Sequence, residues 1–127
     1  MSRTVTAPCV PGSVQELATA KKYRIGLITV VFNDAAFGNV RRTQRTSFGE
    51  RLLGTDLVNP DYVALAEAFG ISGERVTSPE GLTAAITTAA GHGEPVLIEV
   101  PMGEVPSPWH LLHDHLPRPN IPDDLFS

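Results

Sequence analysis

Two short apolar runs limit what this chain can fold into more than any other feature. Ile25–Phe32 reads IGLITVVF and Val96–Val100 reads VLIEV, and polar or proline residues flank both runs. Segments of this length that are largely apolar on both faces and rich in β-branched residues are typical of parallel strands covered by helices on each side. We therefore expect the two segments to be parallel strands of one sheet.

Helical patterns surround these strands and are expected at about residues 13–23, 39–44, 59–70 and 78–91. The first helix is predicted to open with a capping box, in which Ser13 and Glu16 each bond to the other's amide. The third is predicted to have Asn59 as its N-cap and Pro60 as its first residue. Arg75–Val76 is expected to form a further short strand.

This alternation predicts an α/β fold, with an open parallel sheet and helices on both faces. Residues 1–12 have no periodicity and are expected to be an irregular leader. Residues 13–103 are expected to form the partial α/β domain, and residues 104–127 a proline-rich C-terminal tail. Ligands of such sheets bind at the carboxyl ends of the strands, so any site is expected there.

The composition excludes several classes of protein. Ten Lys and Arg residues and a net charge of −4 argue against a nucleic-acid partner. The arginines at positions 41, 42 and 45 are most simply a solvated helix face. Cys9 is the single cysteine, so a disulfide within the chain is impossible. There is no apolar stretch near the roughly 20 residues of a membrane span, and we expect a cytoplasmic protein that does not enter a membrane.

The pair Asn33-Asp34 leaves the first predicted strand and enters a helical segment. Carboxylate and amide oxygens are hard ligands that suit Mg²⁺, and a helix N-terminus offers free amides to phosphate groups. The same two residue types also turn chains and cap helices throughout proteins. The pair alone leaves both interpretations open.

A longer string of motifs favours the first interpretation. In order, the chain contains QELATA, ITVVFND followed by AAFGNVRRTQ, GTD with NPDYVALAEAFG, GEPVLIEVP and VPSPW. Over about Ser13–Leu112, this string resembles the C-terminal diphosphate-binding domain of thiamine-diphosphate-dependent enzymes. The most similar group is the acetolactate-synthase-like one, which includes carboligases, 2-oxo-acid decarboxylases and 2-hydroxyacyl-CoA lyases.

The resemblance implies a site for thiamine diphosphate and Mg²⁺. In that family, a Gly-Asp-Gly motif and the second residue of an Asn-Asn pair bind the metal, together with a backbone carbonyl two residues later. Carried onto this sequence, the metal ligands are Asp34 and the carbonyl of Ala36. The neighbouring residues expected to contact the cofactor are Asn33, Ala35, Phe37 and Gly38.

Two parts of the family's machinery do not match. About 27 residues before Asp34 stands Ala7, within Thr6-Ala7-Pro8, and the chain has no Gly-Asp-Gly; the strand before that motif is also expected to be absent. The glutamate that activates the cofactor belongs to a separate pyrimidine-binding domain, so no catalytic residue is assigned here. We expect a truncated domain that is inactive alone. Its expected partner is a second copy or a chain bearing the pyrimidine-binding domain. The alternatives are a subunit of a two-chain decarboxylase and a non-catalytic α/β interaction module.

Overall fold

The computed structural model describes residues 3–7 and 14–103, and its centre is a four-stranded sheet. The strands are β1 (Arg3–Ala7), β2 (Leu27–Asn33), β3 (Ser72–Arg75) and β4 (Val96–Pro101). The helices are α1 (Glu16–Lys22), α2 (Gly38–Ser47), α3 (Tyr62–Ala68) and α4 (Pro79–His92).

The sheet is parallel throughout, with the strand order β1-β2-β4-β3. In the central pair, Val30 of β2 lies opposite Ile98 of β4. The prediction that the two apolar runs are parallel strands of one sheet is therefore confirmed.

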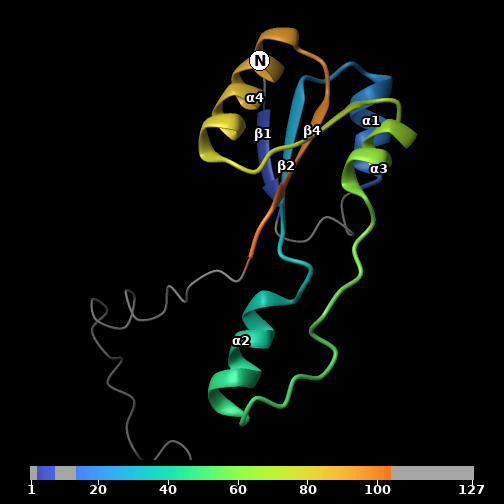
Figure 1. The fold of residues 1–127 in the computed structure, drawn as a ribbon. Coiled ribbons are helices and arrows are strands. Elements are labelled where there is room, and N and C mark those ends of the chain that lie inside the picture. The colour runs from blue at the N-terminus through green and yellow to red at the C-terminus, as the bar shows by residue number, and fades with distance from the viewer. Residues whose placement is uncertain (1–2, 8–13, 104–127) are drawn as a thin grey trace, which may run out of the picture.

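Helices cover both faces of this sheet, as the sequence predicts (Figure 1). One apolar core joins β2 and β4 to α1 and α3, and its buried residues are Leu17, Val31, Tyr62, Ala66, Ile71 and Leu97. The other joins the same strands to α4, and its buried residues are Ile28, Val30, Val76, Ala85, Ala89 and Ile98. Successive strand residues point to opposite faces, which is why Leu97 and Ile98 fall in different cores. The α/β fold class is confirmed.

Strand β1 corrects the prediction for the start of the chain. Residues 1–12 were expected to be an irregular leader without a strand, but Arg3–Ala7 pairs with β2, with Thr6 opposite Val30. The segment RTVTA is rich in β-branched residues, yet it is too short and too polar to show a burial pattern. Its strand conformation depends on the exposed hydrogen-bonding edge that β2 provides.

The starts of two helices also differ from prediction. Helix α1 begins at Glu16, with Gln15 as its N-cap and no side-chain cap bond from Gln15. Ser13, where the capping box is expected, lies outside the described residues. Helix α3 begins after Asp61, whose side chain accepts hydrogen bonds from the amides of Val63 and Ala64. Asp61 is therefore the N-cap instead of Asn59, and the Asn59 side chain donates to Asn33.

Helix α4 begins as predicted and ends slightly later. Ser78 is its N-cap and accepts a hydrogen bond from the amide of Gly81 at 3.0 Å. The helix continues to His92, and Gly93 closes it with a positive φ of 69°. Gly91, expected to close the helix, lies inside it. None of the helices in the described part of the chain has the length and apolar character needed to cross a membrane.

Helix α2 stands away from the two layers, beyond the carboxyl end of β2 (Figure 1). None of its residues is buried. Large apolar side chains of this helix and its flanking segments are exposed: Phe37, Val40, Phe48, Leu52, Leu53 and Val58. We call these six residues the α2 apolar surface. Helix α2 and the turn that leads to it place the candidate site.

Candidate functional site

The turn between β2 and α2 is built from two consecutive side-chain-to-backbone hydrogen bonds. Oδ1 of Asn33 accepts from the amide of Ala35 at 3.1 Å, and Oδ1 of Asp34 accepts from the amide of Ala36 at 3.2 Å. Ala35 has a φ of 50°, in the left-handed region, which costs an alanine on the order of 1 kcal/mol or more. The two side chains hold the turn in a conformation that an alanine would otherwise avoid.

Residues 55–57, further along the chain, form backbone hydrogen bonds with the same turn. The amide of Phe37 donates to the carbonyl of Thr55, and the amide of Leu57 donates to the carbonyl of Ala35, each at 2.8 Å. These bonds form an isolated antiparallel bridge between Ala36 and Asp56. Ala36 is only 9% exposed as a result. The backbone at Ala36 is therefore fixed from both sides.

The side chain of Asp34 lies at the start of α2. A Cβ atom added to Gly38 would come within 2.5 Å of Oδ2 of Asp34, so the carboxylate lies against the first residue of the helix. The amide end of a helix carries a partial positive charge that favours an anion there. Phe37 is the N-cap of α2 and makes no side-chain cap bond. The alternative in which Asp34 caps this helix is therefore wrong, because its bond to Ala36 lies before the helix.

An ion pair links α2 to the segment that supports the turn. Arg41, one turn into the helix, pairs with Asp56. Asp56 is the residue whose backbone faces Ala36 in the isolated bridge. The pair joins the start of α2 to the turn in front of it.

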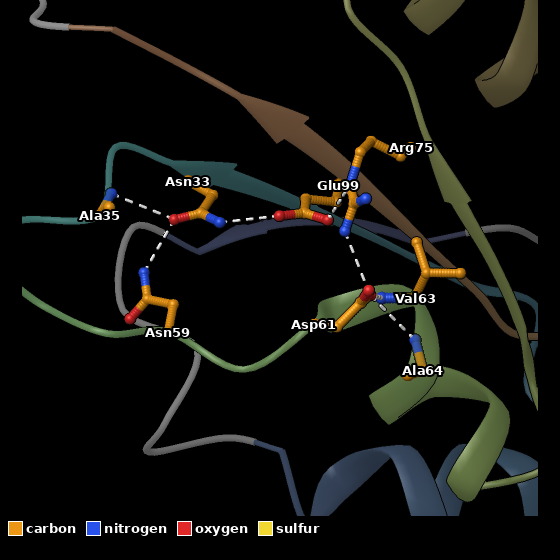
Figure 2. Close-up of polar contacts among 8 residues, drawn as sticks. All are labelled: Asn33, Ala35, Asn59, Asp61, Val63, Ala64, Arg75 and Glu99. Carbon is orange, nitrogen blue, oxygen red and sulfur yellow. Dashed lines mark hydrogen bonds and ion pairs between the residues drawn. The ribbon is translucent and has the colours of Figure 1, made fainter.

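A series of hydrogen-bonded polar side chains runs from the turn across the carboxyl ends of the strands (Figure 2). Oδ1 of Asn33 accepts a second hydrogen bond from Nδ2 of Asn59 at 2.8 Å, and Nδ2 of Asn33 donates to Oε1 of Glu99 at 2.7 Å. Glu99 is 3% exposed although it carries a charge. Its other oxygen, Oε2, accepts from Nε of Arg75 at 2.8 Å.

This series of hydrogen-bonded side chains ends at the N-terminus of α3, where Arg75 also donates to Asp61 at 3.1 Å. The hydrogen bond from the amide of Ala64 holds the pKa of Asp61 below its usual range, and the charge of Arg75 adds to this effect. The hydrogen bond and charge of Glu99 raise the pKa of Arg75 above its usual value. Both groups are charged at neutral pH, and Arg75 lies between the carboxylates of Glu99 and Asp61.

The structure brings the six predicted site residues into one turn at the carboxyl end of β2, from Asn33 to Gly38. Whether they contact a cofactor remains a prediction. Sequence reasoning missed Glu99, Arg75 and the role of Asn59. The one available signal was the charge of Glu99 in the otherwise apolar run VLIEV, since a charged residue in a buried strand needs a partner.

The donor atoms of this turn fit part of a magnesium–diphosphate site. Asp34 provides a carboxylate beside a helix N-terminus, and Gly38 leaves the space in which that carboxylate lies. On the neighbouring strand, β1 ends at Ala7, paired with Val31, and alanine has no ligand atom in its side chain. Among residues 3–7 and 14–103, no three His, Cys, Asp or Glu side chains cluster as a metal site. The fit covers Asp34 and the backbone after it, and Ala7 adds no side-chain ligand.

This fold and turn define an α/β domain with a candidate site at the carboxyl end of its central strand, and comparison with known proteins gives its family. The sequence profile of the family described as "Thiamine pyrophosphate enzyme, C-terminal TPP binding domain" matches residues 10–100. This chain belongs to that family, as the motifs predicted.

Relatives and solved structures agree with this assignment. The chain is 35% identical to the acetolactate synthase isozyme 2 large subunit of Escherichia coli K12, over 84% of this chain and 21% of the relative. It is 32% identical to an acetolactate synthase of Bacillus subtilis, over 84% of this chain and 18% of the relative. It is similar to a thiamine diphosphate-dependent 4-hydroxybenzoylformate decarboxylase from Rhodococcus jostii RHA1, with a TM-score of 0.72 and 25% identity over 84% of this chain and 20% of that one. The chain thus spans about a fifth of the length of the proteins it matches.

Proposed function

We propose that this chain binds the diphosphate end of thiamine diphosphate through Mg²⁺, as part of a carboligase or of a 2-oxo-acid decarboxylase or lyase. The observation that carries the proposal is the position of Asp34, after the central strand β2 and against the first residue of α2. Mg²⁺ takes oxygen ligands from carboxylates, carbonyls and phosphates. The proposed protein ligands are the carboxylate of Asp34 and the carbonyl of Ala36.

The other residues of the turn have supporting parts in this proposal. Asn33 holds the turn through the Ala35 amide, and Gly38 leaves space for the carboxylate. The Arg41–Asp56 pair keeps α2 and its amide end beside that carboxylate. When bound, thiamine diphosphate supplies the nucleophilic thiazolium carbon, and the protein's contribution is orientation and metal binding.

These 127 residues are proposed to bind the cofactor weakly and to be inactive by themselves. Thr6-Ala7-Pro8 stands where the family motif has Gly-Asp-Gly, so position 7 offers no carboxylate and position 8 no amide hydrogen. Mg²⁺ prefers a near-ideal octahedral set of ligands, and loss of one protein ligand weakens it. Catalysis is proposed to need a pyrimidine-binding domain from another chain or another copy.

The α2 apolar surface supports the need for a partner. Val58 and Leu53, in the segment that follows α2, are 103% and 84% exposed. Exposed apolar groups that lie together mark surfaces that other proteins cover. The same observation also favours a second candidate function, in which the chain is a non-catalytic interaction module. Cofactor binding separates the two, because the module requires none.

Calorimetric titration with thiamine diphosphate and Mg²⁺ tests the proposal. The decisive variant restores the motif, as Thr6→Gly/Ala7→Asp/Pro8→Gly, and the matched control is Thr6→Gly/Pro8→Gly, which keeps Ala7. We expect the parent to bind thiamine diphosphate weakly and only with Mg²⁺. The triple variant should bind it clearly more tightly, and the control should bind it no more tightly than the parent. Asp34→Ala should abolish the gain. A triple variant that binds no better than its control would contradict the proposal and favour the interaction module.

A further inference from the structure

Glu99 is a buried carboxylate in an otherwise apolar strand. It lies on β4 between the two apolar cores, with 4% of its side chain exposed. Burying a carboxylate is costly unless its oxygens are paired and hydrogen-bonded. Here each oxygen has its own partner, Asn33 on Oε1 and Arg75 on Oε2 (Figure 2). Position 99 therefore needs a side chain that accepts on both sides.

Asn33 can use its side-chain amide in only one orientation. Oδ1 accepts from the amide of Ala35 and from Nδ2 of Asn59, while Nδ2 donates to Glu99. Turning the amide over would place its NH₂ group against two donors and its oxygen against the carboxylate. Glu99 selects the orientation in which Asn33 can hold Ala35.

We infer that Glu99 is a positioning residue for the site, acting through Asn33. Glu99 orients the Asn33 amide, and Asn33 holds Ala35 at its positive φ. That turn in turn places Asp34 and Ala36, the proposed metal ligands. Arg75 balances the buried charge and ties it to Asp61 at the start of α3. The role of Glu99 in metal binding rests on the proposed function. Its role in the geometry of the turn rests on the hydrogen bonds alone.

The side chains at positions 33 and 99 must be complementary, one donating the hydrogen bond that the other accepts. Glu99→Gln leaves one acceptor oxygen for two donors, so the bond to Asn33 or the bond to Arg75 is lost. Asn33→Asp places a second carboxylate oxygen where a donor now lies 2.7 Å from Glu99. The double variant Asn33→Asp/Glu99→Gln exchanges donor and acceptor across the same pair. Gln can then donate to Asp and still accept from Arg75, and the net charge is unchanged.

Nuclear magnetic resonance on the full 127-residue chain tests this exchange with two readouts. The first is the backbone amide signals of Ala35 and Ala36, which need no metal. The second is broadening of those signals by Mn²⁺, a probe for the proposed Mg²⁺ ligands that detects weak binding. Both single variants should shift the Ala35 amide and reduce Mn²⁺ affinity on the order of tenfold or more, the usual effect of losing an outer partner of a metal ligand. The double variant should restore both toward the parent.

Ile98→Val is the matched control, because Ile98 is the neighbouring residue on β4 and faces the α4 core. It should lower the melting temperature and leave both readouts unchanged. The inference is wrong if Glu99→Gln behaves like this control, or if the double variant folds and leaves the Ala35 amide displaced. Should a single variant not fold, recovery of the fold and of the parental Ala35 signal in the double variant supports the inference. A parent insensitive to Mn²⁺ contradicts the proposed function, while the Ala35 shifts still decide the role of Glu99.

Discussion

A Cβ atom at position 38 would lie 2.5 Å from Oδ2 of Asp34, so the absence of a side chain at Gly38 determines where this carboxylate can lie. The contact involves the end of a side chain and not the backbone. An added methyl group would therefore move the carboxylate and leave the fold in place. A substitution at position 38 should therefore change the geometry of the site without changing the stability of the domain.

Gly38→Ala should reduce the Mg²⁺ response of the chain and change its stability little. The free energy of unfolding should change by less than about 1 kcal/mol, because the better helix propensity of alanine offsets the displaced carboxylate. Gly91→Ala is the control, since nothing lies within 4 Å of a Cβ there and the residue is inside α4. Chemical denaturation and Mn²⁺ broadening measure the two effects. An unchanged metal response in Gly38→Ala would contradict the expected displacement.

Asp34→Asn and Asp34→Ala should differ in stability and agree in metal binding. Asparagine keeps an acceptor for the amide of Ala36, so its stability should match the parent or rise slightly. Alanine loses that bond and should cost about 0.5–1.5 kcal/mol. Both variants lack the carboxylate and should lose any rise in melting temperature with Mg²⁺. A parent whose melting temperature ignores Mg²⁺, with a clear loss in the alanine variant, would assign Asp34 a purely structural role.

Asp61→Ala should destabilise the domain through loss of the α3 N-cap. The side chain satisfies the amides of Val63 and Ala64, and removing such a cap lowers the free energy of unfolding. Asp61→Ser keeps a capping oxygen and removes the ion pair with Arg75, so it should recover most of the loss. Urea denaturation at neutral pH measures both. Equal losses in the two variants would show that the pair with Arg75 matters more than the cap.

The same residue predicts how stability depends on pH. The pKa of Asp61 is lowered in the folded chain, so protonation favours the unfolded state. Its stabilising contribution is present above the unfolded pKa of about 3.9 and is lost as the pH falls through the lower folded value. The stability difference between the parent and Asp61→Asn should therefore shrink below about pH 4. Glu67→Gln, an exposed change in α3, is the control. A difference that stays constant down to pH 2 would be inconsistent with this linkage.

Gly73→Ala should be among the more damaging single-methyl changes in the chain. A Cβ atom on Gly73 of β3 would lie 2.9 Å from the carbonyl oxygen of Val63 and 3.1 Å from Cβ of Ala66, both in α3. Backbone must move to relieve the contact, and such overpacking costs about 1–3 kcal/mol. Thermal melts compared with Gly91→Ala check this. A melting temperature at or above that of the parent would show that α3 shifts freely.

The isolated chain should self-associate, and the α2 apolar surface should be the cause. Leu53→Lys/Val58→Lys removes the two most exposed apolar side chains and should lower the apparent mass at high concentration. Glu67→Lys, a charge change on α3, is the control. Sedimentation showing a monomeric parent at all concentrations would contradict the expectation.

The sequence by itself determined the fold class and the position of the site along the chain. The runs at Ile25–Phe32 and Val96–Val100 predicted buried parallel strands, because local side-chain pattern reports burial on both faces. The motif around Asn33-Asp34 predicted the turn, because the end of a strand and the start of a helix are marked in local sequence. Ser78 as the cap of α4 was predictable for the same reason.

Only the tertiary structure decided the pairing of β1 and the partners of Glu99. Arg3–Ala7 becomes a strand because β2 lies beside it, and no local pattern contains that neighbour. Asn33 and Glu99 are 66 positions apart, and their bond depends on the parallel register of β2 and β4. Asn59 is recruited by Asn33, which leaves Asp61 to cap α3. Side chains that form hydrogen bonds across a sheet are brought together by the tertiary structure, and the local sequence around each one does not identify its partner.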